Sequence, residues 1–199
     1  MKKVLFVNGC IRGAQSRTLR LAQRLVRQIP DAEIDVLALP ALHLTPYDAK
    51  DINERDALSA AGAFSLPFFA LANQFKNADA VVIACPFWDL SVPSMVRNYL
   101  ERLCVTGLTF HYGSDSYPVG DCPMQRFVYV TTRGGVVDNS DPVLADHGTA
   151  YLQSICKLLT RARFDVLAAE GLDIQGNDPE AILRQAEAEA DALALRFWD

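Results

Sequence analysis

Short apolar runs alternate with amphipathic stretches along the whole chain. The apolar runs cover residues 4–7, 34–39, 80–85, 127–131 and 166–169. Three of them are rich in valine and isoleucine and do not strictly alternate with polar residues, which is typical of strands buried on both faces of a parallel sheet. The run at 34–39 is interrupted by Asp35 and alternates more, so we expect it at the edge of the sheet.

The amphipathic stretches predict five helices, at about 18–28, 68–77, 93–105, 145–160 and from 178 onwards. The last one opens with Asp178 and Pro179, a capping residue followed by proline at the first helical position. Five strands that alternate with five helices indicate an α/β fold with a doubly wound parallel sheet, and the strand count favours the order 2-1-3-4-5. Because no repeat or linker divides the sequence, we expect residues 1–199 to form a single domain.

Two segments fall outside this alternation. Residues 40–66 are less regular and are expected to cover part of one face of the sheet. Residues 107–123 are rich in glycine, serine, tyrosine and proline and predict a long loop or small hairpin over a cleft, because loops of this length in compact domains often serve a function. His111 lies in this segment and is either a substrate contact or a partly exposed loop residue.

Charge and cysteine usage narrow the class of protein. The net charge is −5 and no block of lysine or arginine stands out, which argues against a nucleic-acid partner. No apolar run reaches the roughly 18 residues of a membrane span. The five cysteines are scattered and never spaced as CxxC, so we expect neither a disulfide framework nor a metal site. These features predict a cytoplasmic protein.

The loop after the first strand has the pattern of a phosphate site. Residues 8–18 supply glycines for a tight turn and the hydroxyls of Ser16 and Thr18 beside a helix start. The first N–H groups of a helix have no intrahelical partner, and the helix dipole attracts anions there. Arg12 and Arg17 can neutralise a phosphate. The alternative is a capped helix with two solvated arginines, and the loop matches neither GxGxxG nor the P-loop motif.

Two further loops follow buried strands. The one after the third strand begins with Pro86, Phe87, Trp88 and Asp89, and the one after the fourth contains Thr132, Arg133, Gly134 and Gly135. Aromatic side chains on a proline-stiffened loop suit a flat heteroaromatic ring, and a glycine pair allows close backbone approach. The alternatives are core aromatics and a simple turn. Because the carboxyl ends of parallel strands lie at one edge, the three loops together predict one site for a phosphate and a planar ring.

These loops resemble those of the flavodoxin-like NAD(P)H:quinone reductases and FMN-dependent azoreductases. The resemblance covers nearly the whole chain and includes residues 16–18, 86–99, 107–110 and 132–135. It implies that the first loop holds the FMN phosphate through Cys10, Ser16, Arg17 and Thr18. It also implies that residues 86–89 hold the edge of the isoalloxazine ring and residues 132–135 its pyrimidine end.

The sequence departs from this family at several places. Asp89 stands where the family usually has asparagine, and a carboxylate near the flavin disfavours its anionic reduced form. Cys10 replaces a typical serine and weakens one hydrogen bond to the phosphate. Residues 47–65 match the family poorly.

By the same resemblance the chain is expected to bind FMN and to pass electrons from NADH or NADPH to a small acceptor such as a quinone, azo or nitro compound. The flavin carries the chemistry, so no side chain is expected as a nucleophile. The family is commonly homodimeric, with each site completed by the partner subunit. Two alternatives stay open: a non-enzymatic FMN electron carrier of flavodoxin type, and a scaffold of the same fold that has lost its flavin.

Overall fold

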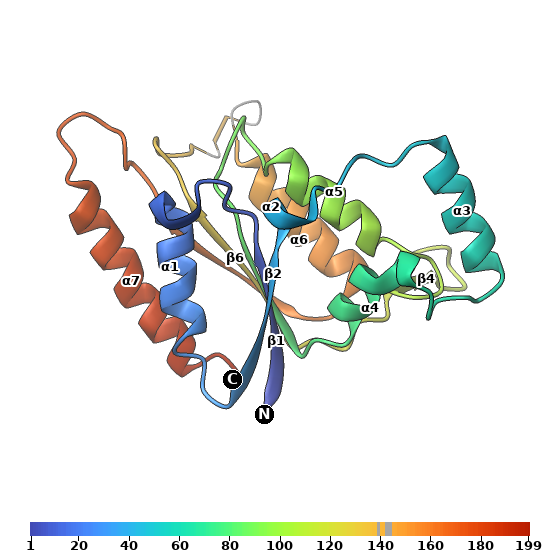
Figure 1. The fold of residues 1–199 in the computed structure, drawn as a ribbon. Coiled ribbons are helices and arrows are strands. Elements are labelled where there is room, and N and C mark those ends of the chain that lie inside the picture. Colours follow the sequence, from blue (N-terminus) through green and yellow to red (C-terminus); the bar gives the residue numbers. More distant parts are fainter. Residues whose placement is uncertain (139, 142–144) are drawn as a thin grey trace.

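The protein is built around a five-stranded parallel sheet (Figure 1). The computed structural model describes residues 1–138, 140–141 and 145–199. The strands of the sheet are β1 (Lys2–Asn8), β2 (Ala32–Ala38), β3 (Ala80–Ala84), β6 (Arg126–Thr132) and β7 (Arg163–Ala169). They lie in the order β2-β1-β3-β6-β7 and all pairs are parallel. The predicted five-stranded parallel sheet is therefore confirmed.

The strand order differs from the predicted 2-1-3-4-5 when the strands are numbered along the chain. Two short strands, β4 (Phe110–Tyr112) and β5 (Pro118–Gly120), precede β6 and pair antiparallel with each other in a separate sheet. The segment at 107–123 is thus a small hairpin, one of its two expected forms. Three-residue strands carry too little periodicity to be recognised in a sequence.

Helices cover both faces of the sheet. One face carries α1 (Arg17–Val26) and α7 (Pro179–Leu195), and the other carries α4 (Ala70–Lys76), α5 (Ser94–Leu103) and α6 (His147–Leu159) (Figure 1). The other helical segments are η1 (Gly13–Gln15), α2 (Leu39–Leu42), α3 (Ala49–Ala60) and η2 (Pro67–Phe69). Among the helices of the described residues, none is long and apolar enough to cross a membrane.

Burial along the strands follows their sequence pattern. Every residue of β3 and β6 is buried, because helices cover both faces of these central strands. β2 has no fully buried residue and pairs only with β1 among the described strands, which confirms the predicted edge position. The helices on the two faces pack on separate hydrophobic clusters.

Helix α3 lies in the segment that gave no regular pattern. Asp48 caps its N-terminus in a reciprocal capping box with Asp51, yet none of its residues is fully buried. In Figure 1 the helix stands to one side, beyond α4 and away from the main sheet. Without an apolar stripe the sequence offers no periodic signal for such a helix.

Candidate functional site

Four loops at the carboxyl edge of the sheet line a cleft of about 190 Å³. They follow β1, β3, β6 and β7. The predicted residues that line the cleft are Cys10, Arg12, Ser16, Arg17, Thr18, Pro86, Phe87, Trp88, Thr132 and Gly134. The structure therefore brings the three predicted loops together. The predicted residues Asp89, Arg133 and Gly135 are not among those that line it.

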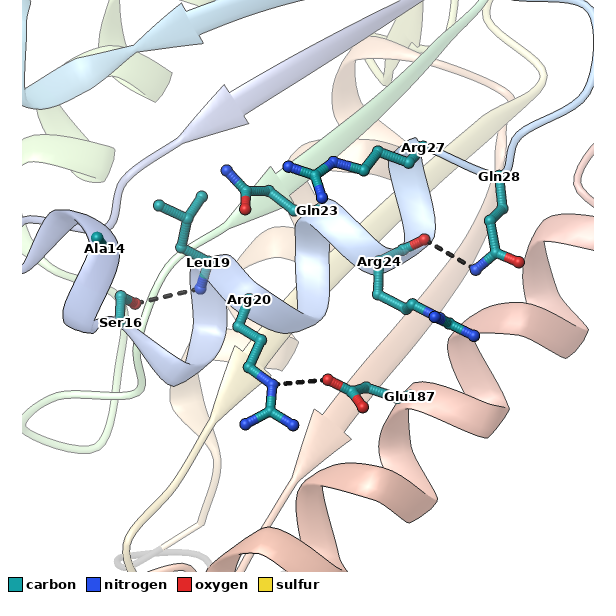
Figure 2. Close-up of a pocket in the computed structure, with 9 residues that line it drawn as sticks. All are labelled: Ala14, Ser16, Leu19, Arg20, Gln23, Arg24, Arg27, Gln28 and Glu187. Carbon is teal, nitrogen blue, oxygen red and sulfur yellow. Dashed lines mark hydrogen bonds and ion pairs between the residues drawn. The ribbon is translucent and has the colours of Figure 1, made fainter.

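A larger, open groove of about 610 Å³ runs along α1 beside α7 and shares only Ser16 with the cleft, as the two sets of lining residues show (Figure 2). Two of its three arginines are already paired: Arg20 binds Glu187 at 2.7 Å, and Arg24 binds Asp191 at 2.5 Å. None of its lining residues comes from the aromatic or glycine loops. The smaller cleft, where these loops meet, is therefore the candidate site.

The first turn of α1 supplies the anion-binding part of the cleft. Gly13 adopts a φ of +53°, which lets the chain turn into η1 just before the helix. Ser16 is the N-cap and its hydroxyl accepts a hydrogen bond from the N–H of Leu19 at 3.1 Å. The N–H groups of Arg17 and Thr18, the first two helical residues, have no intrahelical acceptor. They are the donors that a phosphate at this end can use.

Thr18 joins the first loop to the loop after β6. Its side chain is buried, and its hydroxyl lies 2.6 Å from the hydroxyl of Thr132. Both hydroxyls are thus engaged with each other across the floor of the cleft. Thr18 contributes to the site mainly by fixing the distance between the two loops.

Cys10 packs inward rather than toward solvent. It is 3% exposed, and its thiol donates to the carbonyl oxygen of Ala84 at 3.6 Å. Burial raises the pKa of this thiol to about 11, so the side chain is neutral at pH 7. A neutral thiol that already donates to the backbone offers little to a phosphate dianion.

The aromatic loop turns back on itself in a tight hairpin. Trp88 and Ser91 exchange two backbone hydrogen bonds of 3.0 and 2.9 Å. The two residues between them, Asp89 and Leu90, have φ values of +50° and +63°, as a two-residue turn of the primed type requires. Asp89 is exposed at the tip of this turn, whereas Phe87 and Trp88 line the cleft.

The loop after β6 is fastened to the loop after β7 by its backbone. Leu172 and Asp173 donate their N–H groups to the carbonyl oxygens of Arg133 and Gly134, at 3.2 and 2.9 Å. A Cβ on Gly134 would lie 2.5 Å from the Asp173 carboxylate, so any other residue there would push this carboxylate aside. The carbonyl of Gly135 accepts a hydrogen bond from the N–H of Gly171 at 2.9 Å, and among the described residues no other group lies within 4 Å of where its Cβ would be.

Arg133 lies behind the site rather than in it. It is 6% exposed and forms ion pairs with Asp146, the N-cap of α6, and with Glu170. Its guanidinium also lies 4.9 Å from the centre of the Phe87 ring. Arg133 therefore ties the aromatic loop, the glycine loop and α6 together, a role that the sequence did not distinguish from ligand contact.

Comparison with known proteins agrees with this geometry. A family model described as flavodoxin-like fold matches residues 2–194. The chain belongs to the flavodoxin-like fold family.

Particular flavodoxin-like proteins are also similar. The chain is 38% identical over 126 residues to FMN-dependent NADH:quinone oxidoreductase 2 of Clostridium acetobutylicum, an alignment that spans 63% of this chain and 62% of that relative. It is 30% identical over 206 residues to FMN-dependent NADH:quinone oxidoreductase of Rhizobium meliloti, covering 97% of this chain and 98% of the relative. An azoreductase from Bacillus anthracis superposes with a TM-score of 0.84 at 25% identity, covering 98% and 99%. The resemblance to quinone reductases and azoreductases is therefore confirmed.

One residue of this flavodoxin-like site escaped the sequence analysis. Asp173 lines the cleft and forms an ion pair of 3.0 Å with Arg17. It follows β7, the fifth strand of the sheet, whose carboxyl end lies at the same edge as the others. The loop after the fifth strand could have been included by the same rule, because the carboxyl ends of all the parallel strands lie at one edge. The sequence argument used only the loops after the first, third and fourth strands.

The hairpin carrying His111 does not cover the cleft of its own chain. Cys122, just after β5, donates its N–H to the carbonyl of Leu159 at the end of α6, next to the start of β7. The hairpin thus packs at the amino edge of the sheet, opposite the cleft, and the expected cover is wrong. His111 pairs there with Asp121 at 2.9 Å.

Proposed function

We propose that this chain is an FMN-dependent oxidoreductase that passes electrons from NADH to a small acceptor of the quinone or azo type. The observation that carries the proposal is the meeting of three elements in one cleft: a helix N-terminus with two arginines, an aromatic loop and a glycine loop. Two relatives named FMN-dependent NADH:quinone oxidoreductase and one named azoreductase support it.

The residues present fit FMN. Ser16, the guanidinium of Arg17 and the backbone N–H groups of Arg17 and Thr18 would hold the phosphate at the first turn of α1, where the helix dipole favours an anion. Phe87 and Trp88 would border the ring, and the glycine pair at 134–135 would lie near its polar end. We keep the predicted contact of Arg12 as part of this proposal, and assign Cys10 to packing in the same loop, because its thiol donates to the carbonyl of Ala84.

When bound, FMN would supply the redox chemistry: it would accept a hydride from NADH and pass electrons to the acceptor. The protein itself binds the cofactor, orients it toward the substrates and shields it from water. Backbone N–H groups of the glycine loop would stabilise negative charge at the cofactor, whereas those of Phe87 and Trp88 already donate to the carbonyls of Thr132 and Ser91. The thiols of Cys10 and Cys85 take no part as nucleophiles, since burial raises their pKa values and keeps them protonated at neutral pH.

A second copy of the chain is the proposed partner, and the cytoplasm the proposed location. Several apolar side chains lie exposed on the loops at the carboxyl edge: Ile11 (55%), Trp88 (39%), Leu90 (36%) and Val136 (66%). Exposed apolar surface around a cleft favours a covering partner. Sedimentation of the FMN-loaded protein tests this: a dimer supports the proposal, and a monomer at micromolar concentration contradicts it.

Steady-state turnover separates the enzyme from the non-enzymatic carrier. The FMN-loaded protein is mixed with NADH and a soluble benzoquinone, and NADH oxidation is followed by absorbance. Turnover that is saturable in both substrates supports the oxidoreductase. FMN binding without NADH oxidation would favour the electron carrier, and absence of FMN binding would favour the scaffold.

A further inference from the structure

The ion pair between Arg17 and Asp173 occupies the phosphate end of the cleft. The guanidinium donates three hydrogen bonds to the carboxylate, at 3.0, 3.0 and 3.3 Å. Both residues line the cleft. The other ion pairs between α1 and the α7 region involve Arg20 and Arg24, and these two residues line the separate groove of Figure 2.

The backbone of Asp173 is fixed on the glycine loop, and its carboxylate lies against the same loop. The N–H of Asp173 donates to Gly134, and one carboxylate oxygen lies so close to Gly134 that a Cβ there would be 2.5 Å away. The carboxylate therefore sits in the notch between the glycine loop and the first turn of α1. Arg17 reaches it with a long side chain that has other rotamers available. Both side chains are partly exposed, 37% for Arg17 and 63% for Asp173, so either partner can change its contact.

The charge of this pair opposes a second anion. Hydrogen bonds from Arg17 lower the pKa of Asp173, and the charges of Arg17 and Arg12 lower it further, so the carboxylate is ionised at neutral pH. A phosphate on the first turn of α1 needs the same guanidinium and lies beside this like charge. The carboxylate and the phosphate thus compete for Arg17.

We infer that Asp173 is an internal occupant of the phosphate subsite, which holds Arg17 until a flavin phosphate takes its place and so excludes anions that bring no flavin ring. FMN would add contacts at Phe87, Trp88 and the glycine loop, which line the same cleft and which inorganic phosphate cannot use, so only the flavin would compensate for the displaced carboxylate. The part of this inference that concerns flavin rests on the proposed function, whereas the part that concerns inorganic phosphate does not.

The test compares Asp173→Asn with the wild type, because asparagine keeps the shape and removes the charge. The Tm of each apo-protein is measured in sodium phosphate and in sodium chloride of equal ionic strength. We expect phosphate to raise the Tm of Asp173→Asn by about 2–4 °C and to leave the wild type nearly unchanged. The control Asp191→Asn breaks the Arg24 pair outside the cleft; whatever its own Tm, phosphate should change that Tm as little as it changes the Tm of the wild type.

A second measurement uses flavin affinity. The ratio of the riboflavin Kd to the FMN Kd reports the phosphate contribution alone, and we expect it to rise about fivefold in Asp173→Asn. Adding Arg17→Gln to that variant should abolish the rise. An unchanged or lower ratio, or equal phosphate responses of Asp173→Asn and wild type, would overturn the inference. If no variant binds FMN, the proposed function fails, while the phosphate measurement still decides the role of Asp173.

Discussion

Ser16 and Arg17 combine a structural and a binding role at one turn of helix. Replacing both by alanine removes the N-cap hydroxyl and the guanidinium from the proposed phosphate site. We predict that FMN affinity falls at least tenfold, since each charge-assisted hydrogen bond contributes about 1.5–3 kcal/mol. The lost cap should cost only about 1 kcal/mol of stability, so the apo fold should persist by circular dichroism. Unchanged FMN affinity in a folded variant would refute the assignment.

Asp89 shows how backbone geometry changes a prediction made from sequence. Its position in the family's loop suggests a carboxylate beside the flavin, so that Asp89→Asn would raise the reduction potential. In the structure the residue lies at the exposed tip of a turn with φ +50° and does not line the cleft. We therefore predict an unchanged potential and an equal or higher Tm, because asparagine tolerates this backbone region well.

Potentiometric titration of FMN-loaded Asp89→Asn beside the wild type checks this prediction. A clearly higher potential in the variant would mean that the carboxylate turns into the site when flavin is present.

At the scale of elements, α1 and α7 are held side by side by opposite charges. Hydrogen bonds from Arg24 and Gln28 lower the pKa of Asp191 to about 2. A carboxyl whose pKa is lower in the folded state than in the unfolded state stabilises the fold above its unfolded pKa, near 3.9. This contribution is lost as the pH falls toward 2.

We predict that Asp191→Asn lowers the Tm at pH 7 and that the difference from the wild type disappears by pH 2. Thermal unfolding followed by circular dichroism across this range measures it. Glu189→Gln on the same helix is the control, because Glu189 is exposed and should show no such convergence. A difference that persists at pH 2 would contradict the ion-pair explanation.

Helices and strands could be predicted where burial of one face requires apolar residues at a regular spacing. The run at 80–85 predicted β3, and helical spacing predicted α1, α4, α5, α6 and α7 within a few residues. Helix α3 was missed because it is held by a capping box rather than by an apolar stripe. The same reasoning located three of the four loops of the cleft, since the chain direction of parallel strands fixes where loops meet.

Side-chain direction was not predictable. The sequence places Arg133 beside a glycine pair, but only the fold shows that its guanidinium turns to Asp146, Glu170 and the Phe87 ring. Asp173 is the opposite case, a residue that was not predicted but lies in the cleft. It contacts Arg17, which is 156 positions away in the sequence, and no local pattern indicates such a pair.

At the scale of the whole molecule, the C-terminus closes one face of the core. Phe197 is 1% exposed within the cluster formed by α1, α7 and the sheet, and the guanidinium of Arg126 lies 5.4 Å from its ring centre. Next to it, the indole N–H of Trp198 donates to the carbonyl of Pro30 at 2.8 Å. The last residues therefore pack beside the start of the chain, as the two termini in Figure 1 show.

We predict that Phe197→Ala lowers the free energy of unfolding by about 3–5 kcal/mol, the cost of removing a fully buried ring. Urea denaturation of the apo-protein measures it. Leu195→Ala is the matched control two residues away, because Leu195 is 85% exposed and should change stability by no more than about 0.5 kcal/mol. Equal effects of the two substitutions would mean that the C-terminus does not pack as described.

The central claim is that the four-loop cleft holds FMN and that NADH reduces it there. The most direct test is the visible absorption spectrum of the purified protein, supplied with FMN and freed of excess, before and after anaerobic addition of NADH. We predict a bound flavin spectrum that bleaches with NADH. A protein that stays colourless after incubation with FMN, or a bound flavin that NADH leaves unchanged, would contradict the account.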